Sequence, residues 1–467
     1  MNNIEEKIDL RLKKPFFTEM MVLAHTTGVD QKNYLEKVKE LAIFIREKLE
    51  ERNLIKKLEY KPKEFWNFKG KKNIFNIDGG QLSLSVTGSA ALGIRIGVYK
   101  VKPGDYTKDR EDSDESTTLT TNITDKASSH YDQDEESFMI KYDKMITGTR
   151  MIMEAAEIVK QGNGKGKWKE IPGQNDLIFL HGPISYEATM YHLAENEGVV
   201  PPFKKEFCDQ ILTHQPNYYL EKFKENKGEL NKDLRYFIPL YCEILNQIKN
   251  LKIPAYGVVE RSGGLSSPGP VTRAVLGELY QTKQRREWLV SRQCKNSWDV
   301  KSAGDKAHAK QIEEEFNKRP LSDSVLFDLI LDQGEYIEPV QIIKQWYDKW
   351  PRSHMSLLEH MPEPFSTFIK VSELKRPLKV ETLNILDSYD SDINFIYHSS
   401  RLLPEYCFPL GLDIIDKLTK VPTWMRNTMR NEYHRKVIRK TMETNNPEYI
   451  KLALKSLMPN RNGWNRP

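Results

Sequence analysis

The spacing of apolar residues predicts a chain that begins with a helix and continues with strands. Between residues 30 and 57, apolar side chains recur every three or four positions among many Glu and Lys residues, as in an amphipathic helix with one buried face. Residues 73–78 are a short apolar run ending in Asp78, and the following Gly79 and Gly80 predict the end of that strand. We therefore expect an N-terminal helical region over residues 1–69, with a sheet after it.

Further strands and helices alternate along the rest of the chain. Alternating apolar and polar residues over 82–86 and 93–101 predict two more strands, which we expect to form an antiparallel meander. Residues 138–160 have helical periodicity, and residues 176–181 and 255–260 are apolar runs typical of buried strands. The order of strand, meander, helix and strand predicts an α/β fold with a mixed sheet, helical insertions and a helical C-terminal region.

The composition indicates a globular protein with a sizeable core. The 467 residues are 39% hydrophobic but include 8 Trp, 21 Tyr and 18 Phe, far more aromatic residues than disordered chains carry. A mean hydropathy of −0.63 and the lack of any apolar run of about 18 residues exclude a membrane span. No signal peptide is evident, and the four cysteines stand far apart, as in reduced intracellular thiols. We therefore expect a cytoplasmic protein.

The small net charge of +5 hides two charged segments of opposite sign. Residues 105–136 carry eleven acidic and three basic residues, whereas residues 417–467 carry twelve Lys or Arg and three Glu. The acidic segment has few aliphatic residues and is predicted to be a flexible surface loop. The basic C-terminal segment is typical of a solvated surface, with nucleic-acid binding as the second interpretation.

Three residues stand out as candidates for chemistry. Asp78 ends a buried strand, and the two glycines after it leave room for a ligand, although Asp-Gly is also a common turn. Glu154 lies on the predicted helix over 138–160, where a carboxylate by itself is typical of a solvated face. His181 ends a buried strand, a position more often structural than ligating. Residues 162–167 are similar to an ATP-binding phosphate loop but are one residue too short. If the protein takes part in an ATP-driven process, a partner has to hydrolyse the ATP.

Taken together, six segments resemble the NurA nucleases, partners of the HerA translocase in DNA end processing. The resemblance implies a nuclease domain with a ribonuclease-H-like core over residues 70–425, including the acidic loop 105–136, and a basic helical tail over 426–467. The segments, in the order of that family, are 77–80, Arg150 with Glu154, 177–184, 256–262, 368–371 with 376–381, and 408–412 with Asp416.

The resemblance also implies a metal site. Two divalent metals, Mn²⁺ or alternatively Mg²⁺, would be held by Asp78, Glu154, His181 and Asp416, because hard cations need oxygen ligands that converge from different elements. Tyr256 and Arg261 are the expected nucleic-acid contacts.

The chain departs from the family pattern at two positions. His181 stands where the family has Asp, and imidazole accepts manganese, although the change is also compatible with a lost metal. Asp176 would lie at the far end of the same strand and is a poor substitute. Glu260 stands where the family usually has Lys, which leaves the cation for a phosphate unplaced.

The sequence thus predicts a metal-dependent DNA nuclease that acts on DNA ends and single strands as a homodimer. It would work with a HerA-like hexameric ATPase in end processing or antiviral defence. The alternative is a catalytically degenerate scaffold that binds DNA and regulates that motor. An RNA-guided binder is a third and weaker hypothesis.

Overall fold

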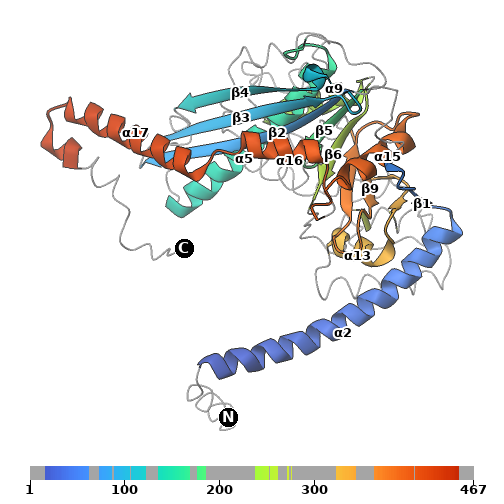
Figure 1. Cartoon of the computed structure of the whole chain (residues 1–467). Helices are drawn as coiled ribbons and strands as arrows, with labels where there is room; N and C mark the ends of the chain where they lie inside the picture. The colour runs from blue at the N-terminus through green and yellow to red at the C-terminus, as the bar shows by residue number, and fades with distance from the viewer. Residues whose placement is uncertain are drawn as a thin grey trace, which may run out of the picture.

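The structure of the protein, a computed structural model, is built around a large mixed sheet with helices on both faces (Figure 1). The described parts of the chain are residues 16–62, 73–86, 89–105, 107–121, 135–168, 176–185, 237–251, 253–260, 271–272, 275, 322–342, 362–403 and 405–451.

Ten strands of the described residues form this single sheet, in the order β1-β7-β9-β10-β6-β5-β2-β3-β4, with β8 paired to β9. Strands β2, β5 and β6 run parallel to one another, and the other pairs are antiparallel, which confirms the predicted mixed α/β fold. The strands are β1 (Ile55–Lys57), β2 (Ile74–Val86), β3 (Ser89–Val101), β4 (Glu111–Thr121), β5 (Leu177–His181), β6 (Ala255–Val259), β7 (Glu335–Ile337), β8 (Val340–Gln341), β9 (Phe365–Ile369) and β10 (Leu378–Thr382).

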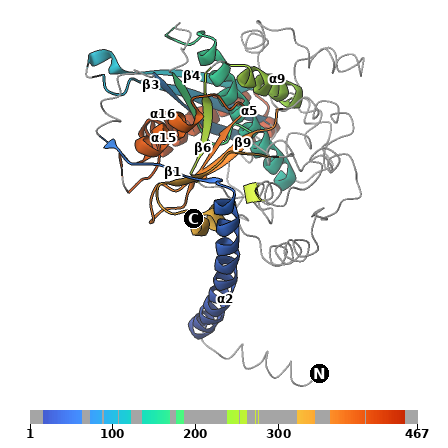
Figure 2. The ribbon, with the colours of Figure 1, turned by 90° about the vertical axis from the view of Figure 1, so that its right-hand side faces the viewer.

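Two pairs of helices cover the centre of the sheet. Helices α5 (Glu135–Gly162) and α9 (Phe237–Lys249) pack on one face, and α15 (Tyr389–Ser400) and α16 (Leu410–Thr419) on the other (Figure 2). Side chains alternate between the two faces along each strand. Leu177 and Phe179 of β5 therefore join the core formed with α15 and α16.

The N-terminal region contributes to the same sheet. Helix α2 (Phe16–Glu51) ends just before β1, which pairs with β7. The C-terminal half of α2 buries Ile45 and Leu49 against α13 (Asp323–Ile330), as the apolar spacing predicts, and Arg46 forms a bidentate ion pair with Glu335. The rest of α2 projects away from the sheet (Figure 1). The proposed domain boundaries at residues 69 and 425 stay a prediction.

Two expectations about the strands were wrong. Strand β2 does not end at Asp78 but continues through both glycines to Val86, because β3 pairs with it over its whole length. The acidic segment is not all loop, since residues 111–121 form the edge strand β4. Three of its four acidic side chains contact a basic neighbour, as Glu115 contacts Arg95, and charged residues are well tolerated on an edge strand. Residues 122–134 lie outside the described residues.

The C-terminal helix α17 (Thr423–Met442) follows α16 directly and crosses the far end of β2. Its apolar side chains Met429 and Tyr433, together with Val421, pack against Leu82 of β2. Among the described helices, none has an apolar stretch long enough to cross a membrane.

Candidate metal centre

The site lies where the parallel pairing of β2 with β5 ends. The register of this pair runs from Ile74 with Leu177 to Ile77 with Leu180, so that Asp78 and His181 are the next residues on each strand. Both follow a residue that points to the α5 face and therefore point to the α16 face. His181 Nδ1 lies 3.2 Å from Asp78 Oδ2. This is the edge of a parallel sheet at which α/β proteins usually bind ligands.

Helix α16 carries the third side chain, and two glycines of the sheet allow it to approach closely. A Cβ atom at Gly80 would collide with the carbonyl oxygen of Thr419. A Cβ atom at Gly97, which pairs with Asp78 across β3, would lie 2.6 Å from side-chain atoms of Ile415 and Thr419. The lack of side chains here brings the last turn of α16 onto the sheet, and Asp416 with it.

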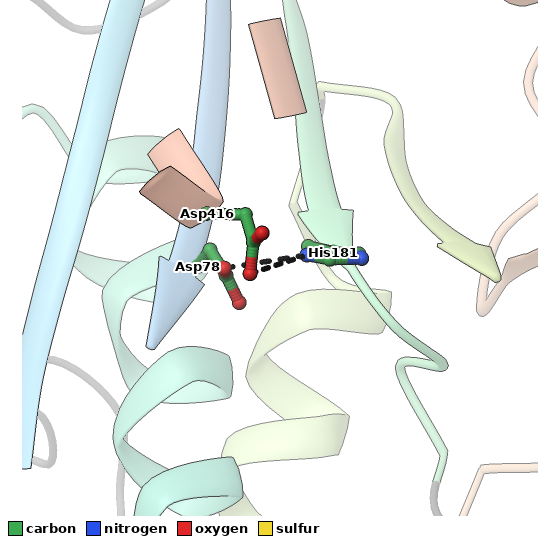
Figure 3. A group of neighbouring side chains, drawn as sticks. All are labelled: Asp78, His181 and Asp416. Carbon is green, nitrogen blue, oxygen red and sulfur yellow. Dashed lines mark ion pairs between the residues drawn. The ribbon is translucent and has the colours of Figure 1, made fainter. Parts of the chain in front are cut away.

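Asp78, His181 and Asp416 form a compact group of potential metal ligands (Figure 3). Each offers one ligand atom, and these atoms lie within 4.8 Å of one another. His181 Nδ1 lies 3.9 Å from Asp416 Oδ1. The Thr419 hydroxyl donates to the Ile415 carbonyl of its own helix at 3.0 Å and lies 3.4 Å from Asp78 Oδ2. Asp78 is buried, while Asp416 and His181 are partly exposed, so the group opens to solvent on one side.

Glu154 approaches the same place from the opposite face of the sheet and is not one of this group. Its side chain is 1% exposed, and a Cβ atom at Gly79 would lie 2.5 Å from its Oε1 atom. Arg150, one turn earlier on α5, places Nε 3.4 Å from Oε1 and donates from Nη1 to the Gly79 carbonyl. Neither oxygen of Glu154 accepts a hydrogen bond of normal geometry from a described residue.

Burial and neighbouring charges change the protonation of this site. Burial raises the pKa of Glu154 to about 8, and the charge of Asp78 adds to this shift while Arg150 opposes it. For His181, burial lowers the pKa, but the hydrogen bond to Asp78 and the charges of Asp78 and Asp416 outweigh burial and raise it above its ordinary value. The carboxylates thus attract positive charge to the place where a metal would lie.

The sequence did not single out Lys420 as part of this site. Its ammonium contacts Asp416, and that hydrogen bond is the main cause that raises the pKa of Lys420. Its side chain is 68% exposed and stands at the open side of the group. The spacing of Asp416 and Lys420 by four residues, as in a helical ion pair, was the only signal available.

Several other expectations about functional residues can be compared with the structure. Tyr256, expected to contact nucleic acid, is fully buried in β6, and its hydroxyl donates to Asp392 Oδ2 at 3.0 Å, so that expectation was wrong. Its aromatic ring serves the core, because β6 is covered on that face by α15. Arg261 lies outside the described residues. Asp176 accepts from the Asn73 amide at the far end of β5, as expected.

The two glycines after Asp78 do not leave room for a ligand. Position 79 lies against Glu154, and position 80 lies against Thr419, so protein atoms occupy both places. In the segment similar to a phosphate loop, Lys167 already has an anionic partner, because it forms an ion pair of 2.8 Å with Asp112 of β4. With positions 79 and 80 filled, the open side of the site lies at the partly exposed His181 and Asp416.

Known proteins match this chain only at the level of structure. No protein-family model and no curated protein sequence matches it. The crystal structure of the NurA nuclease from Sulfolobus solfataricus matches over 91% of this chain and 97% of its own, with 10% identity and a TM-score of 0.46. A crystal structure of NurA covers 92% of this chain and 99% of its own (10% identity, TM-score 0.40).

A further match is the crystal structure of NurA bound to dAMP and manganese, which covers 85% of this chain and 94% of its own. Its identity is 12% and its TM-score 0.37. These structures belong to the family that the sequence motifs resemble.

Proposed function

We propose that the protein is a metal-dependent DNA nuclease of NurA type, with Asp78, His181 and Asp416 as the ligands of a divalent metal. The observation that carries this proposal is the convergence of these three side chains from β2, β5 and α16. Two carboxylates and an imidazole suit Mn²⁺, with Mg²⁺ as the alternative. Glu154, which contacts Arg150 in the structure, would complete the set, as the family resemblance implies.

In this proposal a bound metal would activate a water molecule and stabilise the leaving oxygen of the phosphodiester. The chain's own residues prepare the site for that role. Asp78, buried between β3 and β5, provides a fixed carboxylate. Lys420 supplies a mobile cation at the open side, where it can leave Asp416 and bind a substrate phosphate. Lys420 would thus take the role of the lysine that the family usually has at the position of Glu260.

We also propose a homodimer that works with a HerA-like hexameric ATPase, in DNA end processing or antiviral defence. The sequence resemblance supports both partners, together with a chain that lacks a phosphate loop of its own. Sedimentation of the purified protein and co-purification with the motor test these two points.

The central experiment measures manganese binding by isothermal titration and cleavage of linear and single-stranded DNA. Asp78→Ala is expected to abolish both, whereas Asp109→Ala, which removes an exposed carboxylate outside the site, leaves both unchanged. Unimpaired binding and cleavage in the Asp78 variant would contradict the assignment of the site.

The alternative function is a scaffold that binds DNA without cutting it, and the histidine at position 181 favours it. His181→Asp separates the two. If the wild type binds manganese but does not cleave and His181→Asp cleaves, the site is correct and the natural protein is a scaffold. If neither protein binds manganese, the metal site is wrong.

A further inference from the structure

Helix α17 carries a concentration of positive charge beside the proposed metal centre. Its twenty residues include six Lys or Arg and a single Glu, and all six basic side chains are exposed. Four of them form no ion pair with any residue that the structure describes: Arg426, Arg430, Lys436 and Arg439. Such a charge is available to an anionic partner.

The basic residues of α17 also repel one another. Arg426 with Arg430, and Arg435 with Arg439, are like charges four residues apart on the helix, and such pairs destabilise a helix. Only Arg435 among these four has an acidic partner within α17, since it contacts Glu432 at 2.8 Å. The two pairs lie on opposite sides of α17, and phosphates along the side that carries Trp424 would relieve the repulsion between Arg435 and Arg439.

The position of α17 links this charge to the site. Its apolar side packs on Leu82, which lies four residues after Asp78 on β2, or about 13 Å along an extended strand. The helix begins seven residues after Asp416 and continues away from the sheet (Figure 1). A polyanion bound along α17 would therefore reach the metal centre directly.

Trp424 gives the surface a second feature that favours nucleic acid. It lies in the first turn of α17 and is 68% exposed. Exposed aromatic rings beside basic side chains are the usual platform for unpaired bases, which stack on them. A membrane surface is a poor partner, because Met429 and Tyr433 on the apolar side of α17 already contact Leu82.

We propose that α17 binds single-stranded DNA and guides it to the metal centre, with Trp424 stacking on a base and the basic side chains on phosphates. This inference deepens the proposed nuclease function. The part that leads the DNA strand to the metal centre rests on that function. The binding itself is independent of catalysis and can be measured without metal.

The test is fluorescence anisotropy with a labelled 20-nucleotide single strand in EDTA over a series of salt concentrations. Lys436→Gln with Arg439→Gln removes two unpaired charges from the side of α17 that carries Trp424, which should weaken binding and reduce the slope of log affinity against log salt by about 1.4. Lys32→Gln with Lys39→Gln removes the same charge from exposed positions on α2 and should leave the slope unchanged. Trp424→Ala should weaken binding about tenfold, and Trp424→Phe should restore most of it.

The outcomes separate this proposal from the nuclease function. If the α17 variants keep the wild-type affinity and salt slope, the proposal that α17 binds single-stranded DNA is wrong, even if the protein cleaves DNA. Loss of binding in the α17 variants, in a protein that cleaves nothing with manganese, would support the surface and contradict the nuclease. Equal competition by polyaspartate, with no effect of Trp424→Ala, would assign α17 to an acidic protein and overturn the proposal.

Discussion

Replacing Glu154 by Gln is expected to stabilise the metal-free protein while it removes a residue of the proposed site. The carboxylate is 1% exposed, and its pKa of about 8 lies far above the ordinary value of 4.5. The folded protein therefore binds this proton more tightly than the unfolded chain does. The contribution of the protonated Glu154 side chain to the unfolding free energy is complete below pH 4.5 and is lost as the pH rises through 8.

The magnitude follows from the two pKa values. At pH 7, release of the proton lowers the free energy of the unfolded chain but hardly that of the folded protein. The unfolding free energy of the wild type is therefore about 3 kcal/mol lower than that of a protein with a neutral residue of the same shape. At pH 5 the same difference is under about 1 kcal/mol, because the pH is then only slightly above the pKa of this carboxyl in the unfolded chain. The Gln amide also lacks hydrogen-bond partners at this place, which offsets about 1 kcal/mol of the gain.

The assay is guanidinium unfolding of the metal-free protein, followed by tryptophan fluorescence at pH 5, 7 and 8. The advantage of Glu154→Gln over wild type should grow with pH and reach about 2 kcal/mol at pH 7. Glu157→Gln is the matched control on the same helix. Its carboxylate accepts hydrogen bonds from Gln161 and Lys160, so this variant should be slightly less stable, with no such growth. A Glu154→Gln protein with no pH-dependent gain would refute the reasoning.

Three further predictions test other parts of the structure. Gly80→Ala should lower the unfolding free energy by about 3 kcal/mol and weaken manganese binding, because the new methyl group displaces α16. Gly28→Ala on α2, where no atom lies near the added Cβ, should raise the unfolding free energy by about 1 kcal/mol. Thermal unfolding measures both changes in stability, and titration measures manganese binding. Tyr256→Phe should lower the unfolding free energy by about 1 kcal/mol, as a buried hydrogen bond is lost, and leave DNA binding unchanged, against the earlier expectation of a nucleic-acid contact. Lys420→Met should reduce manganese-dependent cleavage at least tenfold and Lys420→Arg much less; equal rates in all three proteins would exclude Lys420 from phosphate binding.

The sequence by itself determined the parts of this protein that depend on local periodicity. The helices that contain Ile45 and Glu154 and the buried strands that end at His181 and Val259 could all be predicted. Each carries its own pattern of buried positions, and a pattern of period 2 or 3.6 needs no knowledge of the partner. Asp78 and His181 were candidates for the same reason, since each follows an apolar run.

Only the tertiary structure decided how these residues are used. Asp416 reaches Asp78, 338 positions earlier in the sequence, because Gly80 and Gly97 let α16 lie close to the sheet. No local pattern records which element will cover a glycine. The same limit explains why the glycine pair predicts a strand end, and why the expected contact of Tyr256 with nucleic acid was wrong. Partners that are distant in sequence settle both the burial of a side chain and its chemistry.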